Sequence, residues 1–151
     1  MAEPWLRETS LPCDPAVAAV LFALEQAEED LARFVPPACA HFHLRHIAGS
    51  LDRLTTYLQG NPLSQKQLRA LQEEETGSGE TSDQLREACR QAFERTRAAL
   101  LAISPEQFAD ACYIGRKRIR TTVIGLMIHM AEHTQRHVGQ IIAYSRAAFL
   151  A

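Results

Sequence analysis

The sequence lacks the features that mark secreted, membrane-spanning and nucleic-acid-binding proteins. No basic start followed by an apolar core opens the chain, and the longest apolar run, residues 16–24, is too short to cross a bilayer. The formal net charge is -2, so no overall attraction to nucleic acid is expected. We therefore expect a cytoplasmic protein that binds neither a membrane nor nucleic acid.

Cysteine is also scarce, with 4 residues and no C-x-x-C pair. Two disulfides are possible on number alone, but no secretory signal accompanies them. We therefore expect reduced thiols in the core at Cys13, Cys39, Cys89 and Cys112.

The chain has ordinary globular composition, with 46% hydrophobic and 23% charged residues in a length of 151. One domain, residues 1–151, accounts for that length. Apolar residues at helical spacing predict four long helices and one short one. The long ones are residues 16–34, residues 38–58, a third that starts at Thr81 and closes at Ser104-Pro105, and a last one that runs from a cap at Thr121 or Thr122 to about Phe149.

The links between these helices carry cap and turn signals. Asp14-Pro15 opens the first helix, and a capping box at Ser64 starts a short helix that ends near Glu73. Residues 74–82 look like the most flexible stretch, and residues 105–120 look like a connector without a strand pattern. Trp5 and Leu6 are expected to anchor the lead-in by packing. Four amphipathic helices with a long connection predict an all-α four-helix bundle.

Three histidines stand four residues apart in the last helix, at His129, His133 and His137. Positions four apart drift only about 40° around a helix, so the three rings form one stripe. Neutral imidazole binds zinc, nickel, copper or iron, so this spacing predicts a site for a divalent metal ion.

The apolar stripe of the same helix separates these histidines. By wheel arithmetic, His137 lies about 60–70° from its centre, His133 about 100° and His129 about 140°. His133 and His137 therefore flank the core and form the favoured ligand pair, with His129 as a spare. The stripe consists of Val123, Met127, Met130, Thr134, Val138, Ile141 and Ser145.

A rival interpretation uses residues 129–133, which match the H-x-x-E-H pattern of inverted zinc proteases. In that account Glu132 is the general base and His129 is a ligand. It leaves His137 without a role, and a five-residue pattern matches easily by chance.

A catalytic metal usually has three protein ligands, and in a helical bundle they come from facing helices. The remaining histidines, His41, His43 and His46, all lie at the front of the second helix. One of them is therefore expected to complete the site.

Two segments resemble the DinB-like family. Residues 43–53 are similar to its second-helix motif, and residues 132–141 to its final-helix signature, in which His-x-x-x-His precedes a small residue and Gln. The resemblance covers about residues 4–148. It implies an up-up-down-down four-helix bundle that holds one divalent metal through His46, His133 and His137, and it implies a homodimer.

Apolar periodicity and the resemblance differ on the second helix. His43 lies about 70° from the centre of the apolar stripe and His46 about 130°. We prefer His46 because Ser50, Arg53 and Tyr57 share its side of the helix, which suits a polar cavity.

Family members of understood activity include thiol-dependent S-transferases and isomerases, which use bacillithiol or mycothiol, and hydrolases. The resemblance thus implies a metal-dependent enzyme that acts on a small electrophilic substrate, with Zn, Ni or Fe as cofactor and a low-molecular-weight thiol as possible cosubstrate. The basic residues 116–120 are either a binding point for a carboxylate or phosphate or a solvated connector. The alternative function is a non-catalytic, stress-related bundle that binds metal or a partner.

Overall fold

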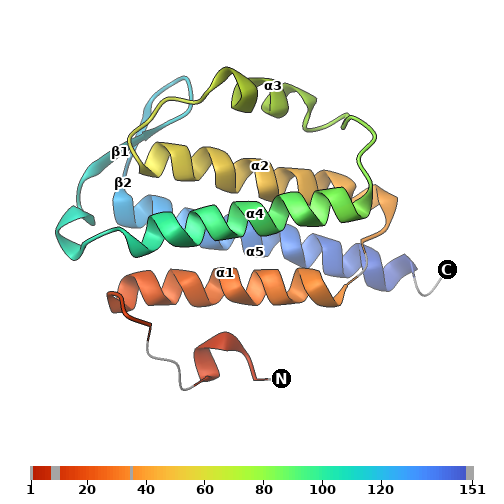
Figure 1. The fold of residues 1–151 in the computed structure, drawn as a ribbon, viewed down its shortest axis with the longest axis horizontal. Coiled ribbons are helices and arrows are strands. Elements are labelled where there is room, and N and C mark those ends of the chain that lie inside the picture. Colours follow the sequence, from red (N-terminus) through yellow and green to blue (C-terminus); the bar gives the residue numbers. More distant parts are fainter. Residues whose placement is uncertain (1, 8–10, 35, 149–151) are drawn as a thin grey trace.

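The computed structural model describes residues 2–7, 11–34 and 36–148, and within them four long helices form a bundle (Figure 1). These are α1 (Pro15–Arg33), α2 (His41–Leu58), α4 (Ser82–Leu101) and α5 (Val123–Ala148). The short α3 (Gln65–Glu73) lies in the connection between α2 and α4. Three short 3-10 turns complete the helical part: η1 (Pro4–Leu6), η2 (Ala38–Ala40) and η3 (Pro105–Gln107). The predicted all-α four-helix bundle with an extra short helix is confirmed.

Helices α1, α3, α4 and α5 begin where the sequence places their caps, whereas α2 begins at His41 without a side-chain cap. The Asp14 carboxylate accepts a hydrogen bond from the Ala16 amide, and capping boxes form at Ser64 and Thr81. The Thr122 hydroxyl accepts from an amide in the first turn of α5. Each cap satisfies amide groups that the helix itself leaves without a partner. The predicted end of the last helix near Phe149 lies outside the described residues.

The resemblance predicts an up-up-down-down order of helix directions, and this prediction is wrong. Figure 1 shows α1 and α5 running one way and α2 and α4 the other. The Thr55 and Thr96 hydroxyl oxygens lie 2.9 Å apart, and Cys89 Sγ donates to the Leu44 carbonyl at 3.2 Å, so contacts advance together along α2 and α4. The order is therefore up-down-down-up. α2 runs back alongside the direction from which α1 came, and residues 59–81 cross the length of the bundle before α4 starts.

The core lies where the apolar stripes of the helices meet. Leu44, Ile47 and Leu51 of α2 are completely buried, as are Met127 and Met130 of α5. Burial of each such side chain contributes about 1.5–3 kcal/mol, so this contact holds α2 firmly against α5. None of the helices in the described part of the chain is long and apolar enough to cross a membrane.

Residues 105–120 form more than the connector that was predicted. Two antiparallel strands, β1 (Ala111–Ile114) and β2 (Ile119–Thr122), form a hairpin whose register pairs Ala111 with Thr122 and Ile114 with Ile119. In the turn, Gly115 has φ 70° and Arg118 has φ 48°. Only Cys112 of the two strands is buried, so the sequence shows no alternation long enough to predict a strand.

Ion pairs, and not Trp5 or Leu6, attach the start of the lead-in to α1. Trp5 is 63% exposed and Leu6 is 56% exposed, so the expectation that they pack as anchors is wrong. Arg7 instead forms ion pairs with Glu25 at 3.0 Å and Glu29 at 2.6 Å on α1. A polar face of α1 therefore receives the segment that precedes it.

All four cysteines carry free thiols, as predicted, but only two of them are in the core. Cys89 and Cys112 are buried, Cys13 is half-buried and Cys39 is exposed. Burial raises the pKa of the Cys89 thiol to about 12.

These environments predict the order of thiol modification. In native protein at pH 8, Cys39 should react quickly with a thiol reagent because it is exposed, and Cys89 should react only after unfolding. Stopped-flow titration with a chromogenic disulfide measures this, and a Cys39→Ser variant should lack the fast phase. Fast modification of Cys89 in folded protein would show that the packing of α4 is looser than described.

Candidate metal centre

The antiparallel contact between α2 and α5 brings histidines of both helices together. His46 Nε2 lies 2.8 Å from His133 Nε2, and His43 Nδ1 lies 2.9 Å from His137 Nδ1. The residue with the higher number on α2, His46, contacts the residue with the lower number on α5, His133. This order is the one that antiparallel helices require. One ring nitrogen each from His46, His133 and His137 fits within a mutual distance of 4.8 Å.

The chemistry of this donor set suits a divalent cation. Zinc–nitrogen bonds are about 2.0–2.1 Å long, so rings already this close need only small rotations to share one ion. Burial, followed by repulsion from His46, His133 and His43, lowers the pKa of His137 to about 4. Burial and then repulsion from His46 also lower the pKa of His133. Both rings are therefore neutral near pH 7, and neutral imidazole is the form that binds a metal.

Glu74 is the residue of this site that sequence reasoning missed. It follows α3 directly, is only 7% exposed, and its Oε2 lies 2.8 Å from His46 Nδ1. With Nδ1–H donating to this carboxylate, the lone pair of His46 Nε2 faces His133. Arg53 Nη1 donates to Glu74 Oε1 at 3.0 Å. Burial raises the pKa of Glu74, but the hydrogen bonds from His46 and then Arg53 outweigh it and hold the pKa below its usual value.

The segment after Glu74, predicted to be the most flexible part of the chain, is tied to α2. Arg45 Nε donates to the Glu74 carbonyl at 3.0 Å, and Arg45 Nη1 lies 3.6 Å from a Glu80 carboxylate oxygen. Gly77, at φ 67°, packs against the same guanidinium: a Cβ there would lie 2.6 Å from Arg45 Nη1. These contacts place residues 59–81, the crossover segment, over the histidine cluster of His46, His133 and His137.

Of the other three histidines that the sequence singled out, His43 and His129 lie at the edge of the cluster, whereas His41 Nε2 lies 2.7 Å from Ser82 Oγ. His43 contacts His137 and has its ring centroid 5.7 Å from that of Tyr144, so it borders the group of three from the α2 side. His129 is 43% exposed and its Nδ1 lies 3.0 Å from a Glu132 carboxylate oxygen. The protease interpretation needs His129 among the ligands, but the described group of three excludes it.

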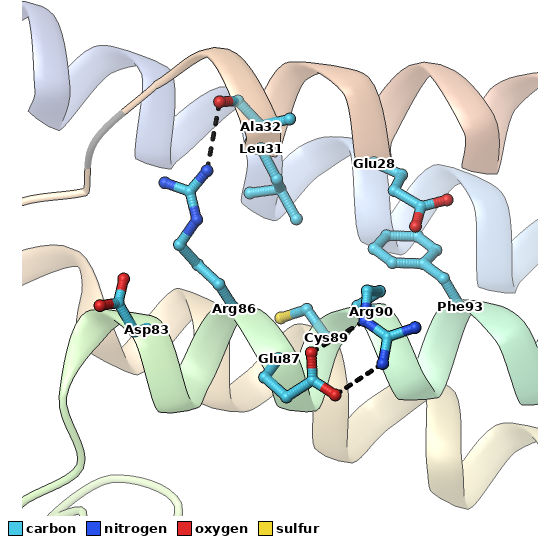
Figure 2. Close-up of a pocket in the computed structure, with 9 residues that line it drawn as sticks. All are labelled: Glu28, Leu31, Ala32, Asp83, Arg86, Glu87, Cys89, Arg90 and Phe93. Carbon is cyan, nitrogen blue, oxygen red and sulfur yellow. Dashed lines mark hydrogen bonds and ion pairs between the residues drawn. The ribbon is translucent and has the colours of Figure 1, made fainter.

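The hollow in Figure 2 is separate from the histidines. It has a volume of about 310 Å³ and lies between α1 and α4, with Leu31, Cys89 and Phe93 among its lining residues. Most of its charged side chains already have partners: for example, Arg86 donates to the Ala32 carbonyl, and Glu87 pairs with Arg90. In the described residues, no group of side chains close enough together to hold a metal ion lies in this hollow.

Fold and site together define a helical bundle with a half-buried cluster of histidines on two facing helices. A scan against family models matches the DinB superfamily over residues 16–141. This range holds all four bundle helices nearly complete and all three clustered histidines. The chain belongs to the DinB superfamily. A search of curated proteins finds no match.

The Glu74 contacts predict a large and specific effect on stability. Glu74→Ala should lower the free energy of unfolding by about 3 kcal/mol because the buried Arg53 guanidinium loses its counter-charge. Denaturant unfolding of the metal-free protein measures the change. The neighbouring exposed Glu75→Ala is the matched control, and it should shift stability by no more than about 0.5 kcal/mol.

A double-mutant cycle tests the reason. Arg53→Ala combined with Glu74→Ala should cost less than the sum of the two single changes, by about 1–3 kcal/mol. Strict additivity would show that the two side chains do not stabilise each other.

Proposed function

We propose that His46, His133 and His137 bind one divalent metal ion, such as Zn, Ni or Fe, and that the chain is a metal-dependent enzyme. The observation that carries this proposal is the convergence of three half-buried imidazoles with a buried carboxylate behind one of them. A histidine–carboxylate pair of this kind orients a ligand ring in many metal sites. The predicted homodimer stays part of the proposal, and light scattering tests it.

Other side chains of the protein hold the proposed ligand rings in position. A bound divalent ion would act as a Lewis acid that lowers the pKa of a thiol or water and polarises a substrate. Glu74 fixes the orientation of the His46 ring, and Phe42 stacks on that ring with a centroid distance of 5.5 Å and an interplanar angle of 19°. His43 Nδ1 lies 2.9 Å from His137 Nδ1, and a hydrogen bond there would orient the His137 ring.

Three protein ligands leave a coordination position free for a reactant. We therefore propose transfer of a small electrophile to a low-molecular-weight thiol, or its hydrolysis, as the reaction class. Both uses need a nucleophile that loses its proton near neutral pH. Neither needs a nucleophilic side chain of the protein.

Metal content tests the ligand set. The variants are purified without a histidine tag. Loss of a residue that only hydrogen-bonds to a metal ligand weakens metal binding about 10–100-fold. Loss of a ligand should weaken it more, so we expect a larger effect from each of His46→Ala, His133→Ala and His137→Ala. His129→Ala is the matched control on α5, and it should retain the metal. Elemental analysis and competition with a chelator give the readout.

His43→Ala distinguishes ligand from neighbour. It should weaken binding less than His46→Ala because His43 contacts His137 from outside the group of three. Loss of metal in His43→Ala with retention in His46→Ala would overturn the assignment on α2. Loss in His129→Ala with retention in His137→Ala would favour the protease arrangement.

Turnover tests the reaction class. Metal-loaded protein should consume a small electrophile with bacillithiol, mycothiol or glutathione, or with water alone, and His133→Ala should be inactive because it has lost a ligand. Product formation is followed by mass spectrometry. Full metal occupancy without turnover for any of these nucleophiles would instead support the non-catalytic metal-binding bundle.

A further inference from the structure

A cavity of about 280 Å³ begins one helical turn from the histidine cluster. Ser50 of α2 lines it one turn after His46, and His129 of α5 lines it one turn before His133. The ring centroids of His129 and His133 are 5.2 Å apart. A molecule in this cavity would therefore lie about one helical turn from the proposed metal centre, on the side of His129 and Ser50.

A second cavity, of about 670 Å³, adjoins the first under the β1–β2 hairpin. Tyr57, Leu63 and Gly115 line both cavities, so the two are neighbours, and together they are called the cleft below. Figure 1 shows the hairpin at the end of the bundle where α2 ends and α5 begins, next to the segment that leads to α3. The cleft thus runs from the histidines to that end of the molecule.

The two halves of the cleft differ in chemistry. The inner half is walled mostly by aliphatic side chains, namely those of Leu54, Leu63, Leu71, Ile114 and Ile119. The outer half adds two guanidinium groups, those of Arg116 and Arg118. A molecule that fills both halves needs an apolar body and a negatively charged end.

The charge at the outer end has no carboxylate partner in the described part of the chain. Most arginines elsewhere are paired, such as Arg53 with Glu74 and Arg97 with Glu28. Arg116 forms no ion pair, and the Arg118 guanidinium lies 4.7 Å above the Tyr113 ring. Asp110 lines the same cavity, but no ion pair joins it to either arginine.

We propose that this cleft is the substrate channel of the metal site and takes a small organic anion, with its apolar body against Leu54 and Ile119 and its carboxylate or phosphate on Arg116 and Arg118. The inference deepens the proposed function and rests on it for the identity of the reacting end. Binding of the anion itself needs only the cleft. The hairpin, which the sequence did not predict, covers the cleft and carries the two guanidinium groups at its outer end.

The hairpin offers its own matched control. Arg116 and Arg118 line the cleft, whereas Lys117 and Arg120 carry the same charge on the same hairpin and do not line it. The test compares Arg116→Ala/Arg118→Ala with Lys117→Ala/Arg120→Ala. All four side chains are exposed, so both double variants should fold, and their melting temperatures verify this.

Three probes share one apolar body: 3-phenylpropionate, 2-phenylethyl phosphate and the neutral 3-phenylpropionamide. Ligand-observed NMR titration gives their dissociation constants. In the wild-type chain the anions should bind more tightly than the amide. The Arg116/Arg118 variant should bind the anions about tenfold more weakly because charge-assisted hydrogen bonds are lost, and the Lys117/Arg120 variant should stay within about twofold of wild type. The carboxylate and phosphate probes identify which anion fits.

The apolar half has a separate readout. Ile119→Ser should weaken all three aromatic probes but leave the binding of inorganic phosphate unchanged. Equal loss of anion binding in the two double variants would overturn the proposal, because it would reflect overall charge rather than the cleft. An amide that binds as tightly as the anions would also overturn it.

The failure of this inference can be told apart from failure of the metal proposal. His133→Ala should lose metal but still bind 3-phenylpropionate, because His133 does not line the cleft. Metal binding without anion binding refutes the channel alone. Anion binding in a wild-type chain that takes up no metal refutes the metal centre and leaves the anion cleft standing.

Discussion

The Glu74 carboxylate is the shared hydrogen-bond partner of Arg53 and His46, and it allows all three side chains to lie inside the bundle. A buried guanidinium or carboxylate without a partner is strongly destabilising, so the Arg53–Glu74 ion pair at 3.0 Å and the His46–Glu74 hydrogen bond at 2.8 Å are mutually dependent. Glu74 comes from beyond α3, whereas Arg53 and His46 come from α2. The charge pair therefore obliges the crossover segment to return to α2, and its return encloses the histidine cluster.

This arrangement joins stability to the proposed chemistry. The carboxylate that neutralises Arg53 is also the one that accepts a hydrogen bond from His46 Nδ1, and this contact points Nε2 toward His133. A substitution that loosens the crossover segment would therefore disturb the orientation of a proposed ligand ring as well as the fold. The α5 side has a parallel support, because His43 contacts the Nδ1 of His137. Two of the three rings, those of His46 and His137, thus have a partner from another segment outside the group of three.

Local signals in the sequence were enough for the helices and for half of the site. Asp14, Ser64 and Thr81 cap helices where their side chains predict it, and four-residue spacing places His133 and His137 on one face of α5. Contacts between distant segments were not readable in this way. Helix directions depend on how far each connection travels, and the β1–β2 hairpin depends on pairing between strands of four residues with little alternation. Glu74 carries no local signal, since Glu73 and Glu75 beside it are exposed.

The position of His46 in the group of three shows why apolar periodicity alone does not locate this group. An apolar stripe locates the face of a helix that meets the hydrophobic core, and that rule favoured His43. In the structure α2 buries a second face under the crossover segment, and this face is polar: Ser50 is 5% exposed and Arg53 is 9% exposed. His46 belongs to that second face. A run of polar residues at helical spacing on the side away from the stripe therefore signals a buried site when a long connection can cover it, and solvent exposure when none can. Residues 59–81 supply that cover in this chain.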